Sequence, residues 1–392
     1  MFVFAQLTSS FFIFIFSFPN AQSDDAHIRL CSFLCIKVVK MSIERLSAEL
    51  KKGEAFLIVS PENRRYLTGF DSTDGYLFIT SSNAAFFADS RYIEAAGAKV
   101  SGCDEIILLK SFKNQLPEYA EKNRINKVYT EAERLSVKQF SELSKAFGCE
   151  VAAEKADEAI NAMRRSKRDF EKQRIIKAQR IAEKAFDHIL GFIREGVTEK
   201  EIALELDYFM LRSGADGLSF ETIAVSGKNS SMPHGVPGRK KIEKGDFITM
   251  DYGAVCDGYH SDMTRTVAVS EVSSKQAEIY ETVLRAQLAA LDALAPGVSC
   301  RDADLAARNI IEKAGYGACF GHGTGHGVGI DIHEAPTVSF RSEQILETGD
   351  IVTVEPGIYI CGEFGVRIED MVYINDTVCE NLTKSEKSLI IL

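Results

Sequence analysis

Three of the seven histidines in this 392-residue chain lie in one glycine-rich stretch, GHGTGHGVGIDIHEAP, at residues 321–336. They are His322, His326 and His333, and five glycines lie among them. A connecting loop has no structural need for imidazole, whereas a metal site or a proton-transfer site does. The stretch is therefore the first candidate for a functional loop.

The segment FITMDYGAVCDGYHSDMTRTVAV predicts a β-hairpin that carries two aspartates. Its Asp257-Gly258 dipeptide is typical of a two-residue hairpin turn, because both residue types tolerate positive φ. That turn would place Asp251 opposite Thr264, with Asp262 one diagonal step away on the same face. Both carboxylates would then lie within reach of a shared ion.

The segment IVTVEPGIYICGEFGVRIEDMVYI predicts a second hairpin, whose turn at Gly362 would place Glu355 opposite Glu369. Taken singly, each of the four acids could be the solvent-facing half of a strand. Carboxylates aligned this closely, however, repel one another unless a cation or a shared proton neutralises them. Four carboxylates and one imidazole from GTGHG form an oxygen-rich set, which suits two divalent ions such as Mn²⁺, Co²⁺, Fe²⁺ or Zn²⁺.

Four motifs, in this order, resemble the metallopeptidase family with the pita-bread fold: MDYGAVCDGYHSDMTRT, GTGHGVGIDIHEAP, VEPGIYI and GVRIEDMVYI. That family includes Xaa-Pro aminopeptidase (aminopeptidase P), Xaa-Pro dipeptidase (prolidase), methionine aminopeptidase and creatinase. The resemblance covers about residues 41–392, and NRRYLTGF (63–70) and ADSRY (88–92) resemble the N-terminal domain of the proline-specific branch. It implies an α+β pita-bread catalytic domain with a smaller, creatinase-like N-terminal α/β domain.

Carried over position by position, the resemblance implies five ligands for two divalent metal ions. Asp251 would bind one ion, and His326 and Glu355 would hold the other. Asp262 and Glu369 would bridge the two ions. The resemblance therefore supplies a ligand role for each of the four hairpin acids and for one histidine of the glycine-rich loop.

The resemblance also implies catalytic residues beside the ions. His234 in MPHGVPG and His333 match histidines that lie next to the metal site, and Arg367 matches an arginine near the substrate. His333 would stabilise the oxyanion, and His234 would help to stabilise the intermediate. Glu355, besides binding metal, would carry a proton towards the leaving nitrogen.

Two further histidines have open roles at this point. His322 could orient a ligand or serve only as part of the loop scaffold, since imidazoles near metal sites often orient ligands. His260 could reach the rim of the site or face solvent. His27 and His188 are expected to have no role in the chemistry.

The activity implied is hydrolysis of the peptide bond between a first residue and a following proline. Xaa-Pro aminopeptidase is the favoured interpretation and Xaa-Pro dipeptidase the alternative, because the two share their chemistry and differ in the substrate length that the cleft admits. A non-catalytic pita-bread binding protein is less favoured, since all five ligand positions are filled. Manganese is the first expected ion, the partners are peptides with proline in second position, and the family implies a homodimer.

The elements that must position these residues follow from hydrophobic patterns. Strand-like and helix-like segments alternate over the first part, which predicts an α/β domain at 41–155. The catalytic domain is predicted at 156–392, and it opens with an amphipathic run of one or two helices over 156–194. Capped helices at 198–214 and 299–317, each followed by a Gly/His segment, hint at an internal pseudo-repeat.

Residues 1–40 are expected to lie outside the fold. Their apolar stretch at 11–18 imitates a signal-peptide core, but no Lys or Arg precedes it, and it is too short to span a bilayer. We therefore expect an upstream extension or spurious leader, with Met41 as the start. A true export signal is the alternative.

Composition argues against some classes of partner and indicates a cellular compartment. The formal net charge of −10 argues against nucleic acid, because phosphate binding requires a basic face. The nine cysteines are dispersed and form no CxxC pair, which is typical of reduced thiols in a cytoplasmic protein. We expect no membrane partner.

Overall fold

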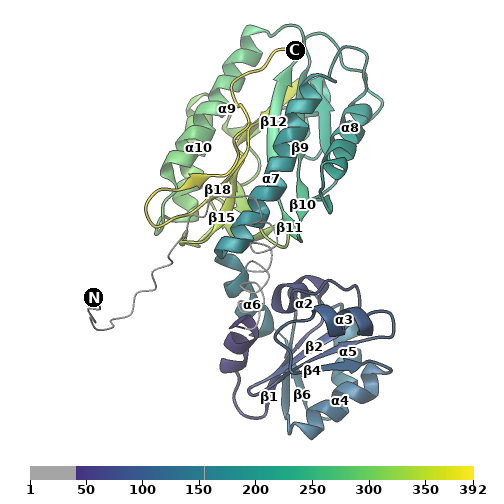
Figure 1. The fold of residues 1–392 in the computed structure, drawn as a ribbon. Helices are drawn as coiled ribbons and strands as arrows, with labels where there is room; N and C mark the ends of the chain where they lie inside the picture. The colour runs from purple at the N-terminus through teal and green to yellow at the C-terminus, as the bar shows by residue number, and fades with distance from the viewer. Residues whose placement is uncertain (1–40, 154) are drawn as a thin grey trace, which may run out of the picture.

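The computed structural model describes residues 41–153 and 155–392, which form a smaller N-terminal domain and a larger second domain (Figure 1). The prediction of an upstream extension falls on residues 1–40 and lies outside the described residues. Within the described part, no helix combines the length and apolar character needed to cross a bilayer. The seven cysteines described there are free thiols.

The N-terminal domain is built on a six-stranded mixed sheet with the order β4-β3-β2-β1-β5-β6. Strands β2 and β3 pair antiparallel and form a hairpin. The strands are β1 (Glu54–Ile58), β2 (Tyr76–Thr80), β3 (Ala84–Ala88), β4 (Glu105–Leu108), β5 (Lys127–Thr130) and β6 (Glu150–Ala152). The helices around them are α2 (Pro61–Thr68), α3 (Ile93–Lys99), α4 (Phe112–Lys122) and α5 (Val137–Ala146), and residues 41–48 are also helical.

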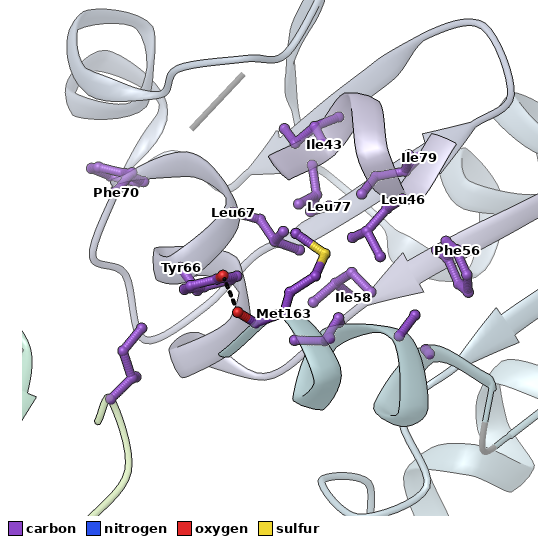
Figure 2. Packing of buried hydrophobic residues seen from close by; sticks show 14 of the residues in the cluster. Ile43, Leu46, Phe56, Ile58, Tyr66, Leu67, Phe70, Leu77, Ile79 and Met163 are labelled. Atoms are coloured by element: carbon purple, nitrogen blue, oxygen red, sulfur yellow. Dashed lines mark hydrogen bonds between the residues drawn. The ribbon is translucent and has the colours of Figure 1, made fainter. Parts of the chain in front are cut away.

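Helix α6 (Lys155–Arg165) packs its apolar side against this sheet (Figure 2). Met163 is buried in one cluster with Ile58, Leu67 and Leu77. The hydroxyl of Tyr66 donates a hydrogen bond to the carbonyl of Met163 at 2.9 Å (Figure 2). The predicted domain boundary at 155/156 falls at the start of α6, so this helix continues the N-terminal core before the chain enters the second domain.

The second domain places helices around four small sheets (Figure 1). Helices α7 and α8 share a buried core with β9 and β12, whereas α9 and α10 share one with β15 and β18. The helices are α7 (Asp169–Leu190), α8 (Glu199–Arg212), α9 (Ser274–Ala293) and α10 (Cys300–Lys313), with short 3₁₀ turns η1 (Gly227–Ser231) and η2 (Gly317–Cys319). The strands are β7 (Gly217–Leu218), β8 (Ile223–Ser226), β9 (Phe247–Tyr252), β10 (Ala254–Cys256), β11 (Tyr259–His260), β12 (Met263–Ala268), β13 (Gly325–Gly327), β14 (Glu334–Val338), β15 (Ile351–Val354), β16 (Gly357–Ile360), β17 (Phe364–Arg367), β18 (Asp370–Tyr373) and β19 (Glu380–Asn381).

The pseudo-repeat suggested by the sequence appears as two helix pairs of similar design. A long helix precedes a shorter one in each pair, with 22 and 14 residues in α7 and α8 and 20 and 14 in α9 and α10. Thr198 caps α8 in a capping box with Glu201, and Ser299 caps α10. The side-chain oxygen of each cap accepts a hydrogen bond from a backbone N–H that the first turn leaves without a partner.

Both predicted hairpin registers are observed. Asp251 pairs with Thr264 between β9 and β12. In the second segment, Val354 pairs with Asp370 and Gly357 pairs with Arg367, so Glu355 and Glu369 lie opposite one another between these pairs.

The structure differs from a simple hairpin, because each segment is divided between two sheets. In the first segment β9 ends at Tyr252, and the chain passes Gly253 before β10 begins in a different sheet. A side chain at Gly253 would collide with the carbonyl oxygen of Ser261 at 1.9 Å. Glycine therefore permits the close backbone approach at which the strand changes sheets.

Gly325 in β13, within the glycine-rich stretch, also allows two backbone segments to approach closely. A methyl group added there would lie 1.9 Å from the carbonyl oxygen of Thr353, so β13 and β15 would have to separate. We expect Gly325→Ala to lower stability by about 1–3 kcal/mol or more, as overpacking does. Thermal unfolding followed by circular dichroism measures the loss.

Gly321→Ala is the matched control for this prediction. Nothing lies within 4 Å of a methyl group added at Gly321, although the residue belongs to the same loop. Its Tm should equal that of the wild type. Equal Tm values for Gly321→Ala and Gly325→Ala would show that the close approach has no energetic consequence.

Candidate metal centre

A cavity of about 540 Å³ lies between the strands of the second domain and contains most of the predicted site residues. Four of the five predicted metal ligands line it, as do all of the predicted catalytic residues. These lining residues are Asp251, Asp262, His326, Glu355, His234, His333 and Arg367. The fifth predicted ligand, Glu369, is buried immediately beside them.

Three of the predicted ligand groups meet at this site. One ligand atom each of Asp262, His326 and Glu369 lies within 4.8 Å of the other two. The Nε2 atom of His326 is 3.6 Å from Asp262 Oδ2 and 3.4 Å from Glu355 Oε1. The carboxylate of Asp251 faces Arg367 and forms an ion pair with its guanidinium group.

Several carboxylate oxygens of this site have no protein partner. Asp251 Oδ1, Asp262 Oδ1 and Glu369 Oε1 are buried, and no described residue hydrogen-bonds to them. Burial and repulsion from neighbouring acids raise the pKa of Asp262 and of Glu369 well above the usual range. Burial also raises the pKa of Glu355. Buried anions of this kind need a proton or a cation, and carboxylates with an imidazole nitrogen are a donor set that fits divalent ions.

Backbone and hydroxyl groups fix the orientation of the predicted ligands. His326 Nδ1 donates to the carbonyl of Gly327 at 3.1 Å, which leaves Nε2 as the free acceptor on the side of the acids. Thr264 donates to Glu369 Oε2 at 2.6 Å, and Thr353 donates to Glu355 Oε1 at 3.1 Å. The atoms that would bind metal are therefore oriented by other groups of the protein.

Arg367 occupies the centre of a buried polar network that includes Tyr359. Its Nη1 atom donates to the Tyr359 hydroxyl at 2.8 Å, and that hydroxyl lies 3.0 Å from His322 Nε2. Burial would lower the pKa of Arg367, but Tyr359, Asp251 and Glu355 raise it well above the usual range. His322, whose role was open, lines the cavity and also connects to Arg367 through Tyr359.

Helix α10 holds the glycine-rich loop through an ion pair that the sequence analysis missed. Asp304 accepts hydrogen bonds from the Thr324 N–H at 3.0 Å and from its hydroxyl at 2.9 Å. Arg308 pairs with Asp304 and donates to the carbonyls of Phe320 and His322. The signal was present in the sequence, because opposite charges four residues apart fall on the buried face of this helix.

Helix α8 anchors the loop that carries His234. The buried carboxylate of Glu199 accepts hydrogen bonds from the N–H groups of Ser226 at 2.8 Å and Gly238 at 3.1 Å. His234 itself is exposed at the cavity wall. His260, whose role was open, lies outside the residues that line the cavity, and its N–H donates to the carbonyl of Gly329.

Arg265 supports Glu369 from behind the cavity. Its Nη1 donates to the Glu369 carbonyl at 2.5 Å, and its Nη2 donates to Asp370 at 2.8 Å. The backbone carbonyls of Ser385 and Glu386 accept from the same guanidinium group, both at 2.8 Å. The C-terminal segment therefore packs directly behind a predicted bridging ligand.

Comparison with known proteins covers both domains. Residues 43–166 match the creatinase/prolidase N-terminal domain, and residues 173–376 match metallopeptidase family M24. The Xaa-Pro dipeptidase of Pyrococcus horikoshii is 38% identical over 338 residues, which span 86% of this chain and 94% of that protein.

Solved structures give the same result. A Xaa-Pro dipeptidase from Bacillus anthracis is 41% identical, with a TM-score of 0.87, over 90% of this chain and 100% of that one. The X-Pro aminopeptidase from Thermotoga maritima is 37% identical, with a TM-score of 0.82, over 88% of this chain and 99% of that one. These neighbours confirm the predicted α+β pita-bread domain with its smaller N-terminal α/β domain. The chain is thus a metal-dependent hydrolase and belongs to metallopeptidase family M24.

Proposed function

We propose that this protein is a Xaa-Pro dipeptidase that hydrolyses the bond between a first residue and a C-terminal proline. The observation that carries the proposal is the meeting of Asp262, His326 and Glu369 side-chain atoms within 4.8 Å beside a cavity of about 540 Å³. Asp251 and Glu355 complete the proposed ligand set for two divalent ions. Such ions supply Lewis acidity, which makes water nucleophilic at neutral pH.

The residues of the chain then perform the remaining tasks. Glu355 accepts a proton from the attacking water and passes it to the prolyl nitrogen, for which burial of the carboxylate is favourable. His333 donates a hydrogen bond to the oxyanion that develops on the scissile carbonyl, and His234 assists from the opposite loop. Arg367 holds Asp251 and Tyr359 in place.

The preference for dipeptides over longer peptides rests on the relatives. The sequence favoured Xaa-Pro aminopeptidase, with Xaa-Pro dipeptidase as the alternative. Relatives called Xaa-Pro dipeptidase or prolidase recur at 36–41% identity, which favours the alternative, while the Thermotoga maritima relative keeps the aminopeptidase as second candidate. Proline lacks an N–H and has a fixed φ, so either activity requires a pocket shaped for it.

Three further properties belong to the same proposal. Manganese is the ion that we expect, since an oxygen-rich ligand set suits it, with Co²⁺, Zn²⁺ or Fe²⁺ as alternatives. We also propose that the enzyme is a homodimer and acts in the cytoplasm, where its dispersed thiols would stay reduced. Size-exclusion chromatography with light scattering measures the oligomeric state, and fractionation of the native host measures the cellular location.

Glu369→Gln tests the metal centre without removing a side chain. The amide keeps the size of the residue but lacks the charge that binds a cation, so the variant should fold and lose most of its metal. We expect Mn²⁺ to raise the Tm of the wild type and to leave the Tm of Glu369→Gln unchanged, and peptidase activity to be abolished. Elemental analysis of the purified protein provides an independent measure.

Glu363→Gln serves as the control for this variant. Glu363 lies between β16 and β17, and its side chain is 48% exposed in an ion pair with Lys275. Both the Mn²⁺-induced rise in Tm and the activity should match the wild type. A Glu369→Gln protein with wild-type turnover would contradict the role of Glu369 in holding the metal.

His333→Ala tests the proposed oxyanion donor. We expect the variant to keep its metal and to lose kcat by a factor of about 10²–10³, as loss of one such donor does. Steady-state kinetics on Ala-Pro with added Mn²⁺, together with metal analysis, measures both quantities. An unchanged kcat would remove His333 from the mechanism.

Substrate length separates the two candidate activities in one assay. Ala-Pro, Ala-Pro-Ala and Ala-Ala are compared at equal enzyme and Mn²⁺ concentrations. For a dipeptidase we expect kcat/KM on Ala-Pro to exceed that on Ala-Pro-Ala by at least about 10-fold, as exclusion from the cleft requires about 1.4 kcal/mol or more. The opposite order would favour the aminopeptidase, and cleavage of Ala-Ala at a similar rate would contradict both.

A further inference from the structure

His333 lies on a turn that is flanked by two acidic residues. The N–H of Asp331 donates to the Glu334 carboxylate at 2.9 Å and so closes the turn around His333. The imidazole rings of His333 and His326 are 4.3 Å apart between centroids. Any displacement of this turn therefore moves His333 relative to the metal centre.

Arg164, near the C-terminal end of α6, binds both acids of the turn. Its Nη2 atom donates to Asp331 Oδ2 at 2.7 Å and also to Glu334. Lys167 donates to the other oxygen of Glu334 at 3.1 Å. Burial alone would raise the pKa of Glu334, but Lys167 and Arg164 lower it to about 2, so this carboxylate is ionised at neutral pH.

These charges are almost completely removed from water. The side chains of Arg164, Glu334 and Lys167 are 4%, 7% and 1% exposed. A buried ion pair of this kind tolerates little displacement, because an unpaired charge would then remain in a medium of low dielectric constant. The network therefore holds the turn in one position.

The N-terminal domain holds Arg164 in turn. Arg164 Nη1 donates to the side-chain oxygen of Asn63 at 2.8 Å, and the Asn63 amide donates to Glu131 at 2.8 Å. Glu131 follows β5, is fully buried and accepts a further hydrogen bond from the Ser60 N–H at 2.9 Å. A continuous series of hydrogen bonds thus joins the end of β5 to the turn that carries His333.

Two more contacts connect the N-terminal domain to the end of α6 and to the turn that carries His333. The Tyr66 hydroxyl donates to the carbonyl of Met163, the residue before Arg164 (Figure 2). Arg134 forms an ion pair with Asp331 directly. The motif NRRYLTGF, which the proposed chemistry does not use, therefore supplies Asn63 and Tyr66 to this connection.

We propose that Arg164 is a positioning residue for His333, and that the N-terminal domain fixes the geometry of the catalytic turn through it. This inference rests on the proposed role of His333 as oxyanion donor. The Nη atoms of Arg164 donate to Asn63 and to the two acids of the turn. Arg164 would therefore act on the reaction through the turn that carries His333. Small displacements of such a donor are costly for the rate and leave substrate binding nearly unchanged.

A double-mutant cycle tests the proposal in the full-length, Mn²⁺-loaded enzyme. Arg164→Gln, His333→Ala and the double variant are assayed on Ala-Pro, with metal content measured for each. We expect Arg164→Gln to lower kcat about 10-fold with KM changed less than about 2-fold, and to have no further effect in the His333→Ala background. A merely structural role would instead lower the rate in both backgrounds.

Arg165→Gln is the matched control, because this neighbouring arginine pairs with Asp350 and Glu347 and not with the turn. It should lower Tm and leave kcat unchanged. If Arg164→Gln does not fold, Arg134→Gln removes one donor to Asp331 at a site 28% exposed and should lower kcat about 3-fold within the same cycle.

The outcomes separate the two proposals. An equal loss from Arg164→Gln with and without His333 would overturn the positioning role and leave the proposed function intact. A His333→Ala enzyme with wild-type kcat would overturn the role of His333 itself, whatever Arg164 does. A 10-fold loss that disappears in the His333→Ala background supports both.

Discussion

Repulsion among buried acids is the constraint on which this structure depends. Asp262 and Glu369 lie close together in the interior, with oxygens that no described residue hydrogen-bonds. An arrangement of this kind destabilises the fold unless protons or cations neutralise it, and bound cations are the solution that the metallopeptidase family implies. The surrounding strands are well suited to hold it, because each predicted ligand lies in or next to a paired segment whose register fixes which side chains face one another.

Hydrogen bonds from surrounding residues also hold the side chains of this site in place. Hydroxyl groups of Thr264 and Thr353 orient two of the acids, and Asp304 in α10 fixes the backbone that leads to His326. A binding or catalytic constellation is only as well defined as the residues that support it. Here the support comes from the helices of the second domain and, through Arg164, from the N-terminal domain, so both matched domains contribute to one site.

Local patterns predicted much of this architecture. Period-two alternation and two turn signals placed Asp251 opposite Thr264 and Glu355 opposite Glu369, since register follows from turn position. The N-caps at Thr198 and Ser299 could also be predicted from the sequence, because a capping residue lies directly beside the helix that it caps. The Arg164–Glu334 pair could not be read, because its partners are 170 residues apart and only the tertiary fold brings them together. The division of both hairpins between two sheets was likewise missed, since it depends on backbone contacts such as that of Gly253 with Ser261.

The contacts of Arg265 have a consequence for the order of events during synthesis. Its guanidinium group is held by the carbonyls of Ser385 and Glu386, while it holds the carbonyl of Glu369. On the ribosome, the N-terminal domain can form as a unit while the second domain is still being translated. A nascent chain that has exposed Asp251 and Asp262 still lacks the segment that closes the pocket from behind. The surroundings of Glu369 are therefore complete only after that segment has been synthesised and has packed behind it.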